Sequence, residues 1–366
     1  MGFACGIVGL PNVGKSTLFN ALTDAGIDAQ NYPFCTIEPN QRFVTVPDPR
    51  LDAIANIANS QKIIHTFMEF VDIAGLVKGA SNNEGLGNKF LGHIRSVDAI
   101  CHVVRCFEDG NITHVSGTID PLDDIATIET ELALADIEAL ERTMQKVQKL
   151  CKTGDKIAKK EYDLLQQLIK QLGTHMHLGD ALHDEDAKAL CKRYQLLTAK
   201  PYFYIANTDE NGLDANHNPL LAKVIAHAEQ KNAQVLSVCA AFEQDLLGLD
   251  ASEKAQMLNE MGMHESGLNK IIRAGYQLLD LSTFFTCGPK EARAWTIRTH
   301  SKAPQAAGAI HSDFEKHFIR AEVIGYQDYI DHNGEQGAKA KGLWRLEGKD
   351  YVVQDGDILE IRHSAK

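Results

Sequence analysis

The chain has 366 residues, 44% of them hydrophobic and 23% charged, which is typical of a globular protein of two or three domains. No run of about 18 apolar residues occurs, so we expect no membrane-spanning helix. The formal net charge of −12 excludes a protein coated with nucleic acid, although one local basic patch could still bind it.

Strand-like and helical patterns alternate along the first 120 residues and again after residue 200. Residues 3–9 predict a buried strand that ends in a glycine turn, and a helix should follow at Lys15–Asp24. Alternation of this kind predicts a parallel sheet with helices on both faces. Further strands are expected at residues 42–46, 67–72, 99–105, 201–206 and 234–238, and further helices at residues 51–58, 89–96 and 219–230.

Between residues 122 and 199 the pattern becomes helical throughout. Apolar residues recur at helical spacing in two arms, and Thr153-Gly154-Asp155 separates the arms. We therefore predict an antiparallel helical hairpin inserted into the α/β domain. Its tip is expected to carry six lysines, namely Lys146, Lys149, Lys152, Lys156, Lys159 and Lys160.

From residue 281 onward, short strand-like runs and turns predict a small separate α+β domain. Asp355-Gly356 is a strong signal for a β-hairpin turn. The strands of this domain are expected at residues 294–298, 322–324, 351–353 and 358–361.

The first glycine turn carries a phosphate-binding motif. Residues 9–16 read GLPNVGKS and match G-x-x-x-x-G-K-S between a predicted strand and a predicted helix, which is the context that the motif requires. Backbone N–H groups and the helix N-terminus would surround the phosphates, Lys15 would neutralise the β and γ phosphates, and Ser16 would hold Mg²⁺. The predicted phosphate cradle is Gly9, Asn12, Val13, Gly14, Lys15, Ser16 and Thr17.

Two further motifs follow in the order found in nucleotide switches. Asp72-Ile73-Ala74-Gly75 ends an apolar strand. We expect Asp72 to reach Mg²⁺ through water and the amide of Gly75 to sense the γ-phosphate. Thr36, which lies between the two motifs, is placed to coordinate Mg²⁺ when a γ-phosphate is present.

Residues 70–81 read FVDIAGLVKGAS, and residues 84–91 read EGLGNKFL. These runs resemble the Obg family of translation-factor-class GTPases, and the whole chain resembles its YchF, or Obg-like ATPase, subfamily. The resemblance implies a P-loop G domain of Ras-like fold over residues 1–280, interrupted by the helical insert at 122–199. It also implies a C-terminal TGS domain of β-grasp type over residues 281–366.

The base-reading segment argues for ATP. GTPases read guanine with N-K-x-D, but the corresponding segment here reads Asn207-Thr208-Asp209-Glu210. The extra methylene of Glu210 displaces the carboxylate that would grip guanine. Asn207 could instead accept a hydrogen bond from the adenine 6-amino group, with Thr208 against the base and Ser237–Ala241 as the other wall. GTP preference remains open.

The hydrolytic machinery departs from that of Ras-type enzymes. Leu76 stands where a glutamine usually orients the attacking water, so we expect slow turnover unless another group substitutes. His114 is the candidate substitute, because its polar loop follows the strand at residues 99–105 and such loops line ligand sites. The alternative is a solvated loop histidine. Asn12 is a second candidate, because asparagine at this position of the phosphate loop can accompany a K⁺ ion that neutralises the phosphates. The alternative is that Asn12 only forms a hydrogen bond within the loop.

We therefore expect a slow Mg²⁺-dependent ATPase that acts as a nucleotide-controlled switch. The resemblance implies association with ribosomes, and RNA contact through the tip between Lys146 and Lys160 and the TGS domain. We expect a monomer without a membrane partner. The scattered cysteines and the lack of a basic N-terminal flank favour the cytoplasm. The alternatives are an Obg-type GTPase and an ATP-binding regulatory module with negligible turnover.

Overall fold

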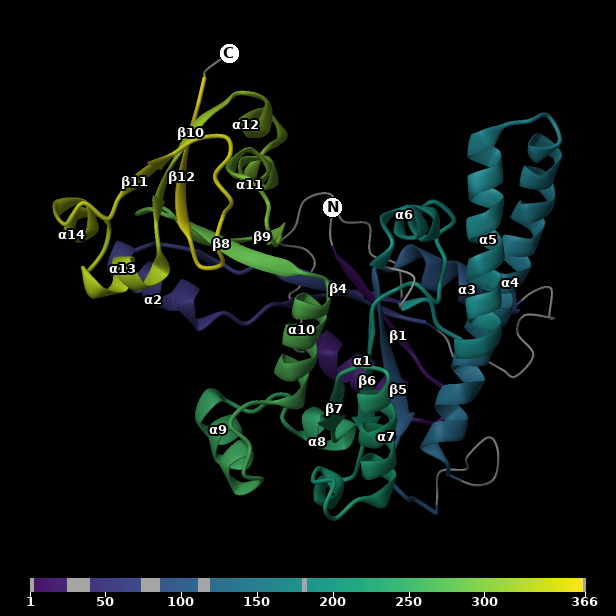
Figure 1. The fold of residues 1–366 in the computed structure, drawn as a ribbon. Coiled ribbons are helices and arrows are strands. Elements are labelled where there is room, and N and C mark those ends of the chain that lie inside the picture. Colours follow the sequence, from purple (N-terminus) through teal and green to yellow (C-terminus); the bar gives the residue numbers. More distant parts are fainter. Residues whose placement is uncertain (1–2, 25–39, 74–85, 111–118, 180–182, 365–366) are drawn as a thin grey trace. The chain divides into compact units, whose positions relative to one another are not determined.

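The computed structural model describes residues 3–24, 40–73, 86–110, 119–179 and 183–364 (Figure 1). Its contacts divide the chain into two compact units. The first unit comprises residues 3–42 and 69–271, and the second comprises residues 43–68 and 272–366. The boundaries fall within strands β2 (Gln41–Thr45) and β4 (Phe67–Asp72) and within helix α10 (Gly267–Leu278).

The first unit is built on a six-stranded sheet of order β2-β4-β1-β5-β6-β7. Every residue of the two adjacent strands β1 (Ala4–Val8) and β5 (Ala99–Arg105) is buried, as expected for central strands covered on both faces. β1 pairs in parallel with β4 and β5, and β5, β6 (Tyr202–Asn207) and β7 (Val235–Val238) continue in parallel. The predicted parallel sheet is confirmed for β1, β4, β5, β6 and β7. The edge strand β2 instead runs antiparallel to β4, since Val46 N donates to the Thr66 carbonyl and Asp72 N donates to the Asn40 carbonyl.

Helices follow the strands as the alternation predicts. α1 (Lys15–Asp24) follows β1, α3 (Leu86–Ser96) precedes β5, and α7 (Pro219–Gln230) lies between β6 and β7. The Asn218 side chain caps α7 by accepting from Leu220 N and Leu221 N. The remaining elements of this part of the chain are the short turn η4 (Glu210–Gly212), α8 (Ala240–Asp245), α9 (Ala251–Glu260) and α10.

The predicted hairpin consists of α4 (Pro121–Cys151) and α5 (Lys156–His175), which lie side by side, with α6 (Glu185–Arg193) after them (Figure 1). Asp155 caps α5 by accepting from Ile157 N and Ala158 N. The buried seam between the helices contains Leu140, Val147, Leu165, Leu168 and Leu172. All six tip lysines are exposed, and Lys160 pairs with Asp186 at the start of α6.

The second unit contains a mixed sheet of order β11-β10-β12-β8-β9-β3. β8 (Leu281–Cys287) pairs antiparallel with β9 (Ala292–Arg298) and parallel with β12 (Ile358–His363), and β12 pairs antiparallel with β10 (Phe318–Ile324). The predicted α+β character is confirmed. The other elements are β3 (Ile63–Ile64), β11 (Arg345–Glu347), α2 (Pro49–Ala58), α11 (Ala303–Ile310), α12 (Ser312–Lys316), α13 (Tyr326–Asp331) and α14 (Glu335–Ala340).

Two local predictions in this unit are wrong. Residues 351–353 form no strand, since only Val352 makes a single bridge, to Lys302. Asp355-Gly356 is a turn but not a hairpin, because the strand that follows it pairs with β10 and β8. The Asp355 carboxylate instead accepts from Thr283 N at 2.8 Å and pairs with Arg50. Asp355 therefore makes tertiary contacts in a turn that the local sequence pattern predicted to close a β-hairpin.

None of the helices in the described ranges is both long and apolar enough to cross a membrane.

Candidate nucleotide-binding site

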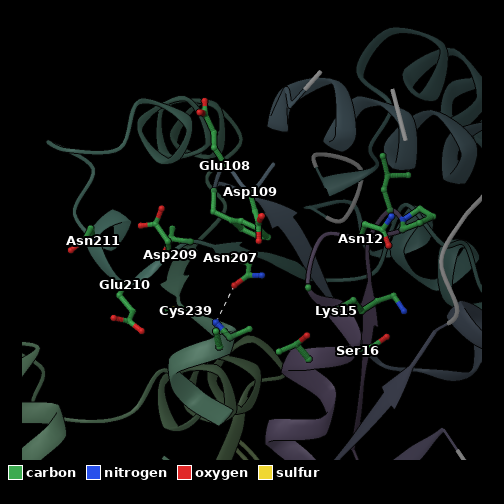
Figure 2. Close-up of a pocket in the computed structure, with 18 of the residues that line it drawn as sticks. Asn12, Lys15, Ser16, Glu108, Asp109, Asn207, Asp209, Glu210, Asn211 and Cys239 are labelled. Carbon is green, nitrogen blue, oxygen red and sulfur yellow. Dashed lines mark hydrogen bonds between the residues drawn. The ribbon is translucent and has the colours of Figure 1, made fainter. Parts of the chain in front are cut away.

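A cavity of about 1090 Å³ opens in the first unit where the parallel strands end. Ligands of α/β proteins bind at this edge of the sheet. The cavity is lined by the loop after β1, the loop after β5, the loop after β6 and the start of α8 (Figure 2). In the view of Figure 2, Lys15 and Ser16 lie at one end, and Asp209, Glu210 and Asn211 lie at the other.

The phosphate loop is held in a conformation that requires glycine. Gly14 has φ +90°, and a Cβ added there would lie 2.0 Å from Asn207 Nδ2. A Cβ at Gly9 would lie 2.7 Å from the carbonyl oxygen of Val103 on β5. Asn12 also has a positive φ, of 64°. Both ends of the loop are therefore packed against the sheet, which leaves its backbone amides for an anion.

Lys15 and Asp72 form an ion pair at the phosphate end of the cavity, with Nζ and Oδ1 2.8 Å apart. Lys15 begins α1 and Asp72 ends β4. The two side chains are 9% and 21% exposed, so the charges are largely withdrawn from water. The cation predicted to bind phosphate and the carboxylate predicted to bind metal are thus adjacent, as the two motifs predict.

The donor set fits Mg²⁺ chemically. Ser16 lines the cavity beside Lys15, and hydroxyl and carboxylate oxygens are the ligands that Mg²⁺ accepts. Within the described ranges there is no cluster of three or more His, Cys, Asp or Glu side chains that could hold a metal. Mg²⁺ sites in P-loop proteins need few protein ligands, because phosphate oxygens and water complete the shell.

The Asn207 side chain links two of the segments that line the cavity. Its Nδ2 donates to the Val13 carbonyl at 2.9 Å, and its Oδ1 accepts from Ala240 N at 3.0 Å (Figure 2). The side chain therefore ties the phosphate loop to the first turn of α8. The sequence pattern alone did not predict this bracing role.

The rest of the base-reading segment forms one wall and the rim. Thr208 is 3% exposed, and its Oγ1 has no hydrogen-bond partner among the described residues. Glu210 begins the short turn η4 and is exposed. Hydrogen bonds from Asn218 hold the loop after β6 in place, since its Nδ2 donates to the carbonyls of Cys106 and Gly212.

The loop after β5 lines the cavity, as the sequence predicts, but we did not predict how the loop is held. Phe107 and Asp109 line the cavity, and both are held by the fully buried Arg105. Arg105 Nε donates to the Phe107 carbonyl at 3.2 Å, and Nη2 donates to the Asp109 carbonyl at 3.3 Å. The guanidinium lies 4.6 Å from the Phe107 ring centroid. The available signal was an arginine at the end of an apolar strand, which must find partners if the strand is buried.

Ser237 pairs with Ala206 inside the sheet and does not line the cavity. The rest of the wall predicted at Ser237–Ala241 does line the cavity, through Cys239, Ala240 and Ala241. Thr36, Gly75, Leu76 and His114 lie outside the described residues.

Comparison with known proteins agrees with this geometry. Residues 4–153 match the family described as "50S ribosome-binding GTPase". Residues 281–364 match YchF-GTPase_C, described as "Protein of unknown function (DUF933)".

Curated relatives extend over nearly the whole chain. Proteins named "Ribosome-binding ATPase YchF" are 58% identical over 362 residues in Haemophilus ducreyi and 52% identical over 363 residues in Bacillus subtilis, covering 99% of each chain. A solved structure described as "Structure of the Schizosaccharomyces pombe YchF GTPase" has a TM-score of 0.89 and 37% identity, covering 99% of this chain and 98% of that one. The chain therefore belongs to the YchF family of P-loop nucleotide hydrolases.

Proposed function

We propose that this chain is a Mg²⁺-dependent ATPase that works as a nucleotide-controlled switch on ribosomes. The observation that carries the proposal is the cavity itself, which has the Lys15–Asp72 pair at one end and a base segment without N-K-x-D at the other. Relatives that are 58% and 52% identical bear the name "Ribosome-binding ATPase YchF", which agrees with both parts of the proposal.

At the phosphate end, the chain supplies charge and oriented dipoles. Lys15 exchanges its contact with Asp72 for the β and γ phosphate oxygens, and the amides of residues 9–17 surround the phosphates. Mg²⁺, when bound, would neutralise charge on the phosphates. Ser16 and Asp72 would hold it, and Thr36 would join them when a γ-phosphate is present.

At the base end, the chain selects adenine. Phe107 provides an aromatic face, and Ala240 provides a small apolar surface. Guanine would need a carboxylate placed for its N1–H and 2-amino groups, but Glu210 is an exposed residue of the rim. Oδ1 of Asn207 retains one lone pair for the adenine 6-amino group.

Turnover is slow in the absence of a partner. Leu76 cannot orient water, so the barrier is lowered by Lys15, by the Gly75 amide and by His114 as the water-positioning group. A K⁺ ion beside Asn12 is a further candidate for charge neutralisation, and equal rates in KCl and NaCl would exclude it. Release of the γ-phosphate frees Thr36 and Gly75, which resets the switch.

The partner is a ribosome or a ribosomal subunit, and the chain meets it in the cytoplasm as a monomer. The hairpin tip has five lysines with no ion pair in the described ranges, since only Lys160 is paired. This tip and the C-terminal domain contact RNA, because exposed lysines release counterions from a phosphate backbone.

The deciding experiment is a titration with non-hydrolysable ATP and GTP analogues in the presence of Mg²⁺. Tighter binding of the ATP analogue is the expected result. Tighter binding of the GTP analogue would favour an Obg-type GTPase, in line with the word "GTPase" in the description of the Schizosaccharomyces pombe structure. ATP binding without turnover, even with ribosomes present, would indicate a regulatory module.

A further inference from the structure

The second unit has a cavity of its own, of about 510 Å³, which shares no residue with the nucleotide site. It is lined by β9 and the residues just before it, by α12 and by the end of β12. A cavity of this size lies within the range of small-ligand sites and can hold one ring system with a sugar.

One part of the cavity wall is a cation stacked on an aromatic ring. The Arg293 guanidinium lies 4.0 Å from the centroid of the Trp295 ring. The two residues are two apart on β9, so they share one face of the strand. Trp295 Nε1 donates to Thr286 Oγ1 at 2.9 Å, which fixes the indole plane. Among the described residues Arg293 has no ion-pair partner, so its guanidinium plane is available to a flat ligand.

A second stack of rings lines the same cavity. Phe314 of α12 and His363 at the end of β12 have ring centroids 4.2 Å apart and an interplanar angle of 19°. His363 is exposed and Phe314 is half-buried, so the stack reaches from the core to solvent. Aromatic rings and a guanidinium plane on separate elements form the kind of surface that receives a planar ring.

The charged groups favour a neutral ring over a phosphate. Glu291 and Asp313 place two carboxylates at the cavity, against the single permanent cation of Arg293. Carboxylates accept from exocyclic amines and ring N–H groups, which nucleobases present on their pairing edge. A phosphate inside the cavity would be repelled by both carboxylates, so it would have to remain at the solvent edge.

We propose that this cavity binds one unpaired nucleobase. The ring stacks on Arg293 and on the Phe314–His363 pair, and Glu291 or Asp313 accepts from its amino group. The base belongs to single-stranded RNA or to a free nucleoside, which offer the same ring. The site is separate from the proposed ATPase site, so either proposal can fail without the other.

Trp295 provides a local reporter. The chain has two tryptophans, so Trp344→Phe leaves Trp295 as the only one. Its fluorescence is followed during titration with an unstructured RNA hexanucleotide and, separately, with guanosine and adenosine, which carry no phosphate. Quenching of Trp295 is expected in at least one arm, and comparison of the arms identifies the source of the base. Absence of quenching in both arms overturns the proposal.

Two substitutions test the walls. Arg293→Lys keeps the charge but loses the flat plane, and Phe314→Ala removes one ring. Each is expected to weaken binding about tenfold, the effect typical of losing one stacking partner. Arg320→Ala is the matched control, because Arg320 is exposed on β10 and does not line the cavity. Equal weakening by Arg320→Ala would contradict the assignment.

A second measurement does not use the Trp344→Phe variant, so it tests the proposal even if that variant misfolds. The anisotropy of a labelled hexanucleotide is measured with the unsubstituted chain at about 50 mM and about 200 mM salt. Stacking predicts a binding constant that changes little between the two concentrations. A steep loss of binding that Arg293→Lys does not alter would assign the oligonucleotide to the tip lysines and overturn the proposal for RNA. The ATPase rate is expected to be unchanged in Arg293→Lys.

Discussion

The side-chain amide of Asn207 donates a hydrogen bond to the carbonyl oxygen of Val13, 2.9 Å away, although 194 positions separate the two residues in the sequence. The same side chain accepts from Ala240 N. The residue that opens the base-reading segment therefore also holds the phosphate loop in place. A change at Asn207 should affect both ends of the cavity.

Replacing Asn207 with Ala should lower the affinity for ATP and GTP analogues alike. The substitution leaves the Val13 carbonyl and the Ala240 amide without their buried partner, at a cost of about 1–3 kcal/mol. Calorimetric titration with both analogues measures the effect. Asn211→Ala is the control, since Asn211 lines the cavity but is exposed. A lower affinity for the ATP analogue with unchanged affinity for the GTP analogue would mean that Asn207 acts as a base reader only.

Arg105→Ala should weaken nucleotide binding without removing any group that lines the cavity. The fully buried guanidinium holds the carbonyls of Phe107 and Asp109, so its loss releases the wall of the cavity formed by residues 107–110. We expect about a tenfold higher Kd for an ATP analogue and a stability loss of about 3 kcal/mol. Calorimetry and urea unfolding measure the two effects. The exposed Arg142 provides a matched Arg→Ala control, and an unchanged Kd in Arg105→Ala would refute the bracing role.

The local motifs predicted that Lys15 and Asp72 lie close together, because each motif depends on its neighbours in sequence. Lys15 and Asp72 meet at 2.8 Å since β1 and β4 are adjacent parallel strands and the motifs follow their carboxyl ends. The long helices of the insert were predictable for the same reason, as their apolar spacing persists over many turns.

The base end was less predictable because it depends on contacts distant in sequence. Of the wall predicted at Ser237–Ala241, Cys239, Ala240 and Ala241 line the cavity. Ser237 does not, because strand β7 continues to Val238. The β-hairpin predicted at Asp355-Gly356 is wrong for a similar reason. The Asp355 carboxylate accepts a hydrogen bond from the Thr283 amide and forms an ion pair with Arg50, both distant in sequence.

His114→Ala should reduce the turnover number while sparing nucleotide affinity. Leu76 cannot position the attacking water, so a second polar group near the γ-phosphate has to do so. Loss of such a group costs about a hundredfold in rate. Single-turnover hydrolysis and analogue binding are measured on the same preparation, and His264→Ala, at an exposed position, serves as control. An unchanged rate would remove His114 from the mechanism.

Replacing tip lysines with glutamine should flatten the salt dependence of ribosome binding. Each lysine that contacts phosphate contributes roughly 0.7–0.9 to the slope of log K against log salt. Lys149, Lys152 and Lys156 are exposed and have no ion pair in the described ranges. Co-sedimentation with ribosomes at several salt concentrations gives the slope. Lys223→Gln on α7 should leave it unchanged, and an equally steep slope in the triple variant would exclude the tip from RNA.

His102 should make folding stability depend on pH. It is buried on β5, and burial lowers the pKa of its imidazole to about 4, with Glu129 opposing this shift and Lys231 and His227 adding to it. The unfolded chain takes up the proton near pH 6.5, whereas the folded chain does so only near pH 4. The contribution is therefore fully present above pH 6.5 and is lost as pH falls towards 4, by at most about 3 kcal/mol.

His102→Leu should remove this dependence, because the buried Nε2 of His102 has no hydrogen-bond partner among the described residues and a neutral side chain of similar size replaces it. Urea unfolding at a series of pH values between about 4 and about 7 gives the two stability profiles. The exposed His264 supplies the control, as His264→Leu should retain the wild-type slope. If His102→Leu loses stability on acidification as steeply as the unsubstituted chain, the acid sensitivity arises from other groups, and the buried imidazole contributes nothing to it.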